Sequence, residues 1–166
     1  MAYDFDRQFS EGRSGEDFLD AFFTARGHTV RPATRDEQRQ GIDRVITVPG
    51  GRSMKVEYKT DFLAGKTGNA FVETISVDTQ GKMGWALTAQ CDYLIYYIPD
   101  HAIYVIPAQS LRWALPGWMR DYPARQAPNH GYQTHGVLVP LARLAEYAIQ
   151  TFHLNGAGGP ADAPPR

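Results

Sequence analysis

The feature that most constrains the fold is a pair of alternating segments joined by a Gly-rich turn. Residues 42–48, IDRVITV, are rich in β-branched residues, and residues 54–60, MKVEYKT, alternate apolar and charged side chains. Alternation with a period of two predicts half-buried strands, and the intervening PGGRS predicts a turn. Together the segments predict two adjacent strands, with Glu57 and Lys59 on the same face of the second one.

This arrangement brings three charged side chains to one patch. Glu57 and Lys59 project to the same side, about 7 Å apart along the strand. Pairing around the turn places Asp43 on the neighbouring strand, opposite them. Two carboxylates that lie a few Å apart repel each other when both are ionised. A bound Mg²⁺ or Mn²⁺ ion relieves this repulsion by its positive charge, and both ions prefer oxygen ligands such as carboxylates. With Lys59 beside the ion, the group suits the hydrolysis of a phosphodiester bond.

A simpler structure also explains the same residues. An exposed strand face with an ordinary surface ion pair needs only Glu57 and Lys59, and such a pair contributes little stability. A Glu-x-Lys sequence alone is a weak signal, and it gains value from the predicted strands on both sides and from Asp43. The residues by themselves leave the metal site and the surface ion pair open.

Asp43 in GID, with Glu57 and Lys59 in VEYK, resembles the motif of the PD-(D/E)XK nuclease superfamily, which includes Holliday-junction resolvases and small phage-type nucleases. The resemblance extends over about residues 14–106, although Ile42 stands where the family name has Pro. It implies an α/β fold with a restriction-endonuclease-like mixed β-sheet sandwiched by helices. It also implies a metal-dependent nuclease that hydrolyses phosphodiester bonds of DNA, in phage or prophage DNA processing, recombination or repair.

The resemblance also implies roles for individual residues. Asp43 and Glu57 would bind Mg²⁺ or Mn²⁺, and Lys59 would act on the water or the scissile phosphate. Glu16 matches the helix glutamate with which many members reach the metal, and it equally suits a first-turn carboxylate favoured by the helix dipole. Glu73, in the next predicted strand, is a further candidate metal ligand, or a strand carboxylate exposed to solvent.

Basic residues near this patch suit contacts with a DNA backbone. The candidates are Arg35, Arg39, Arg44, Lys66 and Lys82, each of which equally suits a solvated surface. Lys66 stands in AGKTG, which lacks the earlier glycine of a phosphate-binding loop because Thr60 occupies that position. The sequence therefore predicts no nucleotide cofactor, and the resemblance implies DNA as the partner.

Composition bounds the class of protein. The 166 residues include 43% hydrophobic and 21% charged residues, which is typical of a globular chain and predicts one domain over residues 1–154. The Gly/Pro-rich sequence of residues 155–166 predicts a disordered tail. The net charge of −1 provides no global positive field that would draw the chain onto nucleic acid. The single cysteine, Cys91, and the lack of a long apolar run predict an intracellular protein with no membrane partner. The resemblance to the nuclease superfamily implies the cytoplasm of a bacterial host or of a phage-infected cell.

The remaining patterns predict the other elements. The expected helices begin at Ser14 with a capping box, at Trp85, at Pro107 with a break at Pro116, and near the end of the chain. The other expected strands are 28–32 at a sheet edge, 69–77, and a hairpin of 92–98 with 102–106, whose first strand is buried on both faces. Loops are expected over 33–40, 62–68 and 122–136.

A second function from another class fits the same fold. A catalytically silent relative would bind nucleic acid or a host protein and would need neither a metal site nor a groove for a DNA backbone. For the nuclease, the resemblance also suggests a homodimer.

Overall fold

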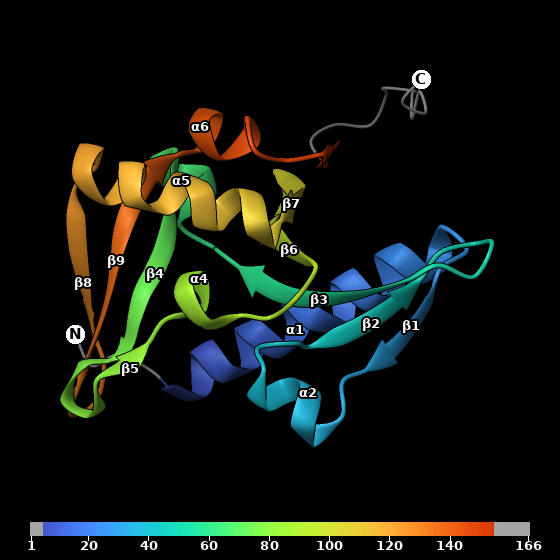
Figure 1. Ribbon diagram of the computed structural model, residues 1–166, viewed down its shortest axis with the longest axis horizontal. Coiled ribbons are helices and arrows are strands. Elements are labelled where there is room, and N and C mark those ends of the chain that lie inside the picture. Colours follow the sequence, from blue (N-terminus) through green and yellow to red (C-terminus); the bar gives the residue numbers. More distant parts are fainter. Residues whose placement is uncertain (1–4, 155–166) are drawn as a thin grey trace.

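The computed structural model describes residues 5–154 (Figure 1). The helices in this range are α1 (Phe5–Ala25), α2 (Arg35–Arg39), α3 (Ala64–Thr67), α4 (Trp85–Thr88), α5 (Ala108–Asp121) and α6 (Leu141–Ala145), with a 3₁₀ turn at Asp78–Gln80. The strands are β1 (Thr29–Pro32), β2 (Arg44–Thr47), β3 (Ser53–Thr60), β4 (Asn69–Val77), β5 (Lys82–Met83), β6 (Tyr93–Ile98), β7 (Ala102–Pro107), β8 (Ala124–Pro128), β9 (Gln133–Pro140) and β10 (Gln150–His153). The tail predicted over 155–166 lies outside the described residues.

The strands form two sheets. The larger has the order β1-β2-β3-β6-β7-β10 and is mixed, because β3 and β6 run parallel while its other neighbours are antiparallel. The smaller is antiparallel, with the order β5-β4-β9-β8. The predicted mixed α/β fold is confirmed. The predicted strand 69–77 is also confirmed, but as β4 it belongs to the smaller sheet, which the sequence did not reveal.

The larger sheet is buried on both faces. On one face, Leu19 and Phe23 of α1 pack against Ile46, Val56 and Ile95. On the other, α5 and the smaller sheet cover β6 and β7, as Figure 1 shows. The central strand β6 is buried over five of its six residues, which confirms the prediction from its nearly continuous apolar sequence.

Helix α1 is longer than the sequence predicted. It begins at Phe5, so the predicted cap at Ser14 is wrong, and Ser14 and Gly15 lie inside the helix. Gly15 lies so close to Thr60 of β3 that a Cβ at this position would overlap the threonine side chain. The small residue that suggested a helix start therefore allows α1 to approach the sheet. Gly27 ends the helix as predicted, with φ of 83° and its N–H bonded to Thr24 O.

The loop predicted over 33–40 contains α2. Thr34 caps this short helix: its side chain accepts a hydrogen bond from Glu37 N–H, and the Glu37 carboxylate accepts one from Thr34 N–H. This reciprocal capping box explains why a wholly polar segment folds as a helix. A loop was likewise predicted over 62–68, but Ala64–Thr67 of this segment form the single helical turn α3.

The break predicted at Pro116 does not occur. Helix α5 continues through Pro116 to Asp121. The residues on its inner face, Leu111, Ala114, Leu115 and Trp118, are buried on both sides of the proline. Their burial offsets the missing backbone hydrogen bond and the ring clash, which otherwise disrupt a helix interior.

The last third of the chain also differs from the predictions. The loop expected over 122–136 contains β8 and the start of β9. The expected closing helix is reduced to the five residues of α6, and the chain returns to the larger sheet as β10, beside β7. No helix in residues 5–154 is long and apolar enough to cross a bilayer.

Candidate active site

Strand β3 sends its side chains alternately to the two faces of the larger sheet. Val56 and Tyr58 pack in the core beside α1. Glu57 and Lys59 therefore point to the opposite face, as the alternation predicted. There the Lys59 Nζ lies 5.9 Å from the centre of the Trp85 ring at the start of α4. The site thus lies where β3 meets α4, the short helix that follows β5.

Asp43 stands directly before β2, and backbone hydrogen bonds on both sides hold it. Its N–H donates to Val56 O, and its carbonyl accepts from Ala33 N–H, each at 2.9 Å. Its Oδ2 accepts a hydrogen bond of 2.8 Å from Tyr58 N–H. The carboxylate is therefore fixed over β3, beside Glu57, as the pairing around the turn predicted.

Glu57 is a buried carboxylate, and its residue is only 6% exposed. Its Oε1 lies 2.7 Å from Lys59 Nζ. Burial raises the pKa of Glu57 to about 7; Lys59 lowers it, while the charge of Asp43 and a hydrogen bond with Asp43 raise it. The pKa of Glu57 thus rises even with a lysine in direct contact, because burial and the neighbouring carboxylate outweigh the cation.

Lys59 lies among three carboxylates. Burial lowers its pKa, but Glu57, Asp43 and Glu73 together raise it above the usual value, so this lysine is a firm cation. Glu73 reaches the group from β4. Burial raises the pKa of Glu73, while Lys59 and a hydrogen bond from the Trp85 backbone N–H act in the other direction. The structure therefore places Asp43, Glu57, Lys59 and Glu73 in one electrostatic group.

The candidate metal ligands are the pair Asp43 and Glu57. Among residues 13–154, whose side chains the structure describes, no group of three or more His, Cys, Asp or Glu is arranged to hold a metal ion. Two carboxylates are nevertheless a sufficient protein contribution for Mg²⁺, which keeps several water ligands and takes others from a substrate phosphate.

The structure does not bring Glu16 into this group. Its Oε2 accepts a hydrogen bond of 2.9 Å from Arg44, and Asp20 accepts another from the same guanidinium at 3.0 Å. The Arg44 side chain is 14% exposed. Arg44 therefore joins β2 to α1 by an ion pair, and the predicted roles of Glu16 and of Arg44 at the metal or the DNA stay predictions.

The other predicted DNA-contacting residues are exposed to solvent. Arg35 and Arg39 are exposed on α2, where Arg39 pairs with Asp36 at 2.9 Å. Lys66 is exposed on α3, and Lys82 is exposed on β5, the strand beside β4. Arg35 and Arg39 share α2, whereas Lys66 and Lys82 lie on two other elements.

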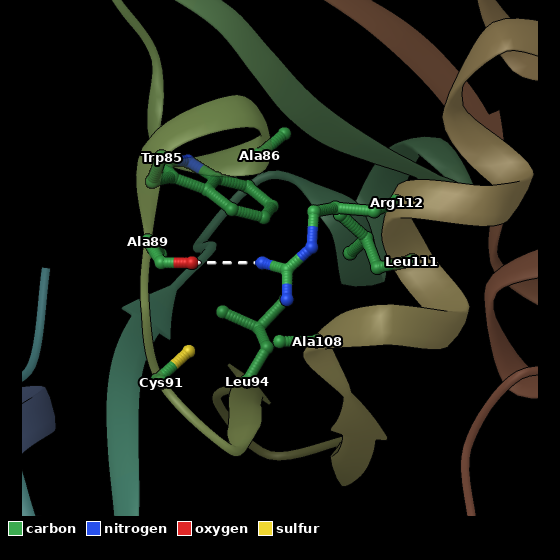
Figure 2. Close-up of a pocket in the computed structure, with 8 residues that line it drawn as sticks. All are labelled: Trp85, Ala86, Ala89, Cys91, Leu94, Ala108, Leu111 and Arg112. Atoms are coloured by element: carbon green, nitrogen blue, oxygen red, sulfur yellow. Dashed lines mark hydrogen bonds between the residues drawn. The ribbon is translucent and has the colours of Figure 1, made fainter.

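A small pocket adjoins the site behind Trp85. Figure 2 shows Arg112 reaching from α5 between Trp85 and Leu94, with its guanidinium donating a hydrogen bond of 2.8 Å to Ala89 O. Cys91 lines the same pocket and is buried, so it packs in the core. The sequence did not predict that Trp85 lies beside Lys59, because this contact depends on how α4 packs against β3.

Comparisons with known proteins yield one structural likeness. No protein-family model matches the sequence, and no curated protein matches it. A solved structure of a bacterial homing endonuclease, I-Ssp6803I, is similar over 75% of this chain and 74% of that chain, with 19% sequence identity and a TM-score of 0.47.

Proposed function

We propose that this chain is a metal-dependent nuclease of the PD-(D/E)XK type that hydrolyses phosphodiester bonds of DNA. The observation that carries the proposal is the buried Glu57 carboxylate, fixed between the carboxylate of Asp43 and the Lys59 ammonium. By its resemblance to that superfamily, the chain would act in DNA processing, recombination or repair.

The alternative of a surface ion pair does not fit this geometry. Such pairs are exposed and cost little to form. Glu57 is buried, and its pKa is raised to about 7, so its environment disfavours the charged form. Burying a carboxylate beside a second one is unfavourable unless a further cation compensates. A binding site for a divalent cation accounts for this arrangement, whereas a role in stability does not.

The donor set fits Mg²⁺ or Mn²⁺. Tyr58 N–H occupies Asp43 Oδ2, which orients the carboxylate and leaves its second oxygen for an ion. Oxygen donors from two carboxylates are the ligands that these hard cations prefer. When bound, such an ion would acidify a water molecule and stabilise negative charge on the phosphorus centre.

Lys59 is the residue that would act on the attacking water or on the scissile phosphate. As a firm cation beside Glu57, it can hold an attacking water molecule by hydrogen bonding or offset charge on the scissile phosphate. Glu73 keeps Lys59 charged from the side of β4. Trp85 limits the movement of the lysine, because its ring packs beside Nζ.

The test is a cleavage assay on linear, circular and branched DNA, with Mg²⁺, with Mn²⁺ and with EDTA. We expect metal-dependent cleavage by the wild type and a loss of at least about 100-fold in rate for Asp43→Asn and for Lys59→Met. Asp121→Asn, an exposed carboxylate on α5, is the matched control and should cleave like the wild type. Cleavage that persists in both site variants, or no cleavage of any substrate, would overturn the proposal.

A further inference from the structure

The smaller sheet connects the candidate active site to a two-stranded ribbon whose edge strand, β8, is mostly exposed. We use the word ribbon for β8 and β9, which lie side by side with β4 in Figure 1. Their register pairs Glu73 of β4 with Gly136 of β9, and Gly136 with Arg125 of β8. Glu73, Gly136 and Arg125 thus form one row across three strands, with Arg125 about 10 Å from Glu73 by the spacing of two strands.

These three residues share one face of the smaller sheet. Val72 and Val137, their neighbours in sequence, pack in the core on the opposite face. Because successive side chains alternate, Glu73 and Arg125 both lie on the outer face. Between them Gly136 has no side chain, and the Phe71 ring fills the space: its Cζ would lie 2.7 Å from a Cβ at Gly136. The outer face of the ribbon is therefore continuous with the site.

The ribbon is also free of acidic residues. Residues 122–145 contain no Asp or Glu, although the whole chain has 18. The nearest carboxylate at the tip, Asp78, already accepts hydrogen bonds from Gln133 N–H and Thr79 N–H and lies 3.3 Å from His135 Nε2. A polyanion approaching the ribbon would thus meet no carboxylate on β8 or β9, although Glu73 of β4 lies on the same face.

Arg125 differs from the five arginines of residues 13–154 that pair with a carboxylate. The arginines that pair with a carboxylate are Arg31, Arg39, Arg44, Arg120 and Arg143. Arg125 is exposed, and its guanidinium donates a hydrogen bond of 3.2 Å to Ala124 O. Among residues 13–154 no carboxylate forms an ion pair with Arg125, so its guanidinium can bind an external anion.

We infer that the outer face of the ribbon binds the sugar–phosphate backbone of double-stranded DNA, with Arg125 contacting a phosphate of the same duplex that is cleaved at Asp43 and Glu57. This inference rests on the proposed nuclease function and adds the surface that positions its substrate. A duplex backbone suits the surface because it is a continuous polyanion, and an arginine without a carboxylate partner binds phosphate through two parallel hydrogen bonds. Arg125 is thus a positioning residue, not a catalytic one.

The test is binding of a fluorescein-labelled 30-base-pair duplex of mixed sequence, measured by anisotropy in EDTA over a series of salt concentrations. We expect Arg125→Ala to weaken binding on the order of tenfold and to reduce the slope of log K against log[salt] by about 0.9, the value for one lost phosphate contact. Arg125→Lys should recover part of the affinity. The matched control is Arg143→Ala, which changes net charge equally on α6 and should bind like the wild type.

Cleavage and oligomeric state are measured on the same proteins. If the wild type cleaves, Arg125→Ala should raise KM with little change in kcat. Unchanged binding and KM in Arg125→Ala would overturn the inference while the nuclease function stands. Arg125-dependent binding without cleavage by the wild type would overturn the nuclease function alone. A change of oligomeric state in Arg125→Ala at unchanged DNA affinity would show that the ribbon binds a second copy, and would also overturn the inference.

Discussion

At the scale of single residues, the decisive feature is the proton affinity of Glu57. Its pKa rises from an ordinary 4.5 to about 7, chiefly because the side chain is buried; Lys59 lowers the pKa, and Asp43 raises it further, so burial and Asp43 together outweigh the lysine. In the metal-free protein, a large share of Glu57 is therefore protonated near neutral pH. Binding of a divalent cation requires the carboxylate form, so pH and metal affinity are linked at this residue.

The first prediction concerns stability without metal. Below pH 4.5 Glu57 is protonated in both states, and above about pH 7 it is ionised in both. Between these values the folded chain holds a proton that the unfolded chain has lost, so the free energy of unfolding falls as pH rises, by up to about 3 kcal/mol. Urea denaturation in EDTA from pH 4.5 to pH 8 should show this fall in the wild type. It should be absent from Glu57→Gln, and equal slopes in both proteins would contradict the assigned pKa.

The second prediction concerns Asp43, which has both a structural bond and a charge. Asp43→Asn keeps an oxygen that accepts from Tyr58 N–H, whereas Asp43→Ala leaves this N–H without its partner. The alanine variant should therefore unfold with a free energy about 1–3 kcal/mol lower than the asparagine variant. Asp43→Asn should also lower the pKa of Glu57, since the neighbouring charge is gone. Denaturation and carboxyl NMR titration measure the two effects, and an unchanged Glu57 pKa would show that the two carboxylates do not interact.

At the scale of elements, alternation and burial decided which predictions succeeded. The segments around the PGG turn are strands β2 and β3, and the apolar hairpin is β6 and β7, because period and hydrophobicity are strong there. Strand β8 was missed because it is an exposed edge strand without an apolar face. Helix α2 was missed although Thr34 and Glu37 form a capping box, since no apolar face accompanies it.

The third prediction concerns the close approach of β4 and β9. A Cβ at Gly136 would lie 2.7 Å from Phe71 Cζ and from Val72 O, so the sheet must shift to accept it. Gly136→Ala should lower the free energy of unfolding by about 1–3 kcal/mol. Gly117→Ala is the control, because the nearest atom to its Cβ is Arg120 Nη2 at 3.7 Å and it lies inside α5. It should raise stability by up to about 1 kcal/mol. A Gly136→Ala protein as stable as the wild type would show that this contact is loose.

At the scale of the whole molecule, the site depends on how two sheets meet. The local hairpin placed Asp43 beside Glu57 and Lys59, so this part of the site was predictable from the sequence. The sequence offered Glu73 only as a candidate, because β4 and β3 belong to different sheets. Whether Glu73 acts on Lys59 therefore depends on how the two sheets pack. The pairing of Glu16 with Arg44, and not with the carboxylate pair, depends on the tilt of α1, for which the sequence carries no local signal.

The most direct test of the central claim is a calorimetric titration of Mn²⁺ into the full chain at pH 8, where Glu57 is ionised. The wild type should bind Mn²⁺ at one site, and Asp43→Asn and Glu57→Gln should each weaken that binding by at least about tenfold, since each loses one of two charged ligands. Binding should also weaken at pH 5.5, where Glu57 holds its proton. Asp121→Asn, the matched control on α5, should bind like the wild type. Equal Mn²⁺ affinity in the wild type and in both site variants would contradict the assignment of Asp43 and Glu57 as the metal-binding pair.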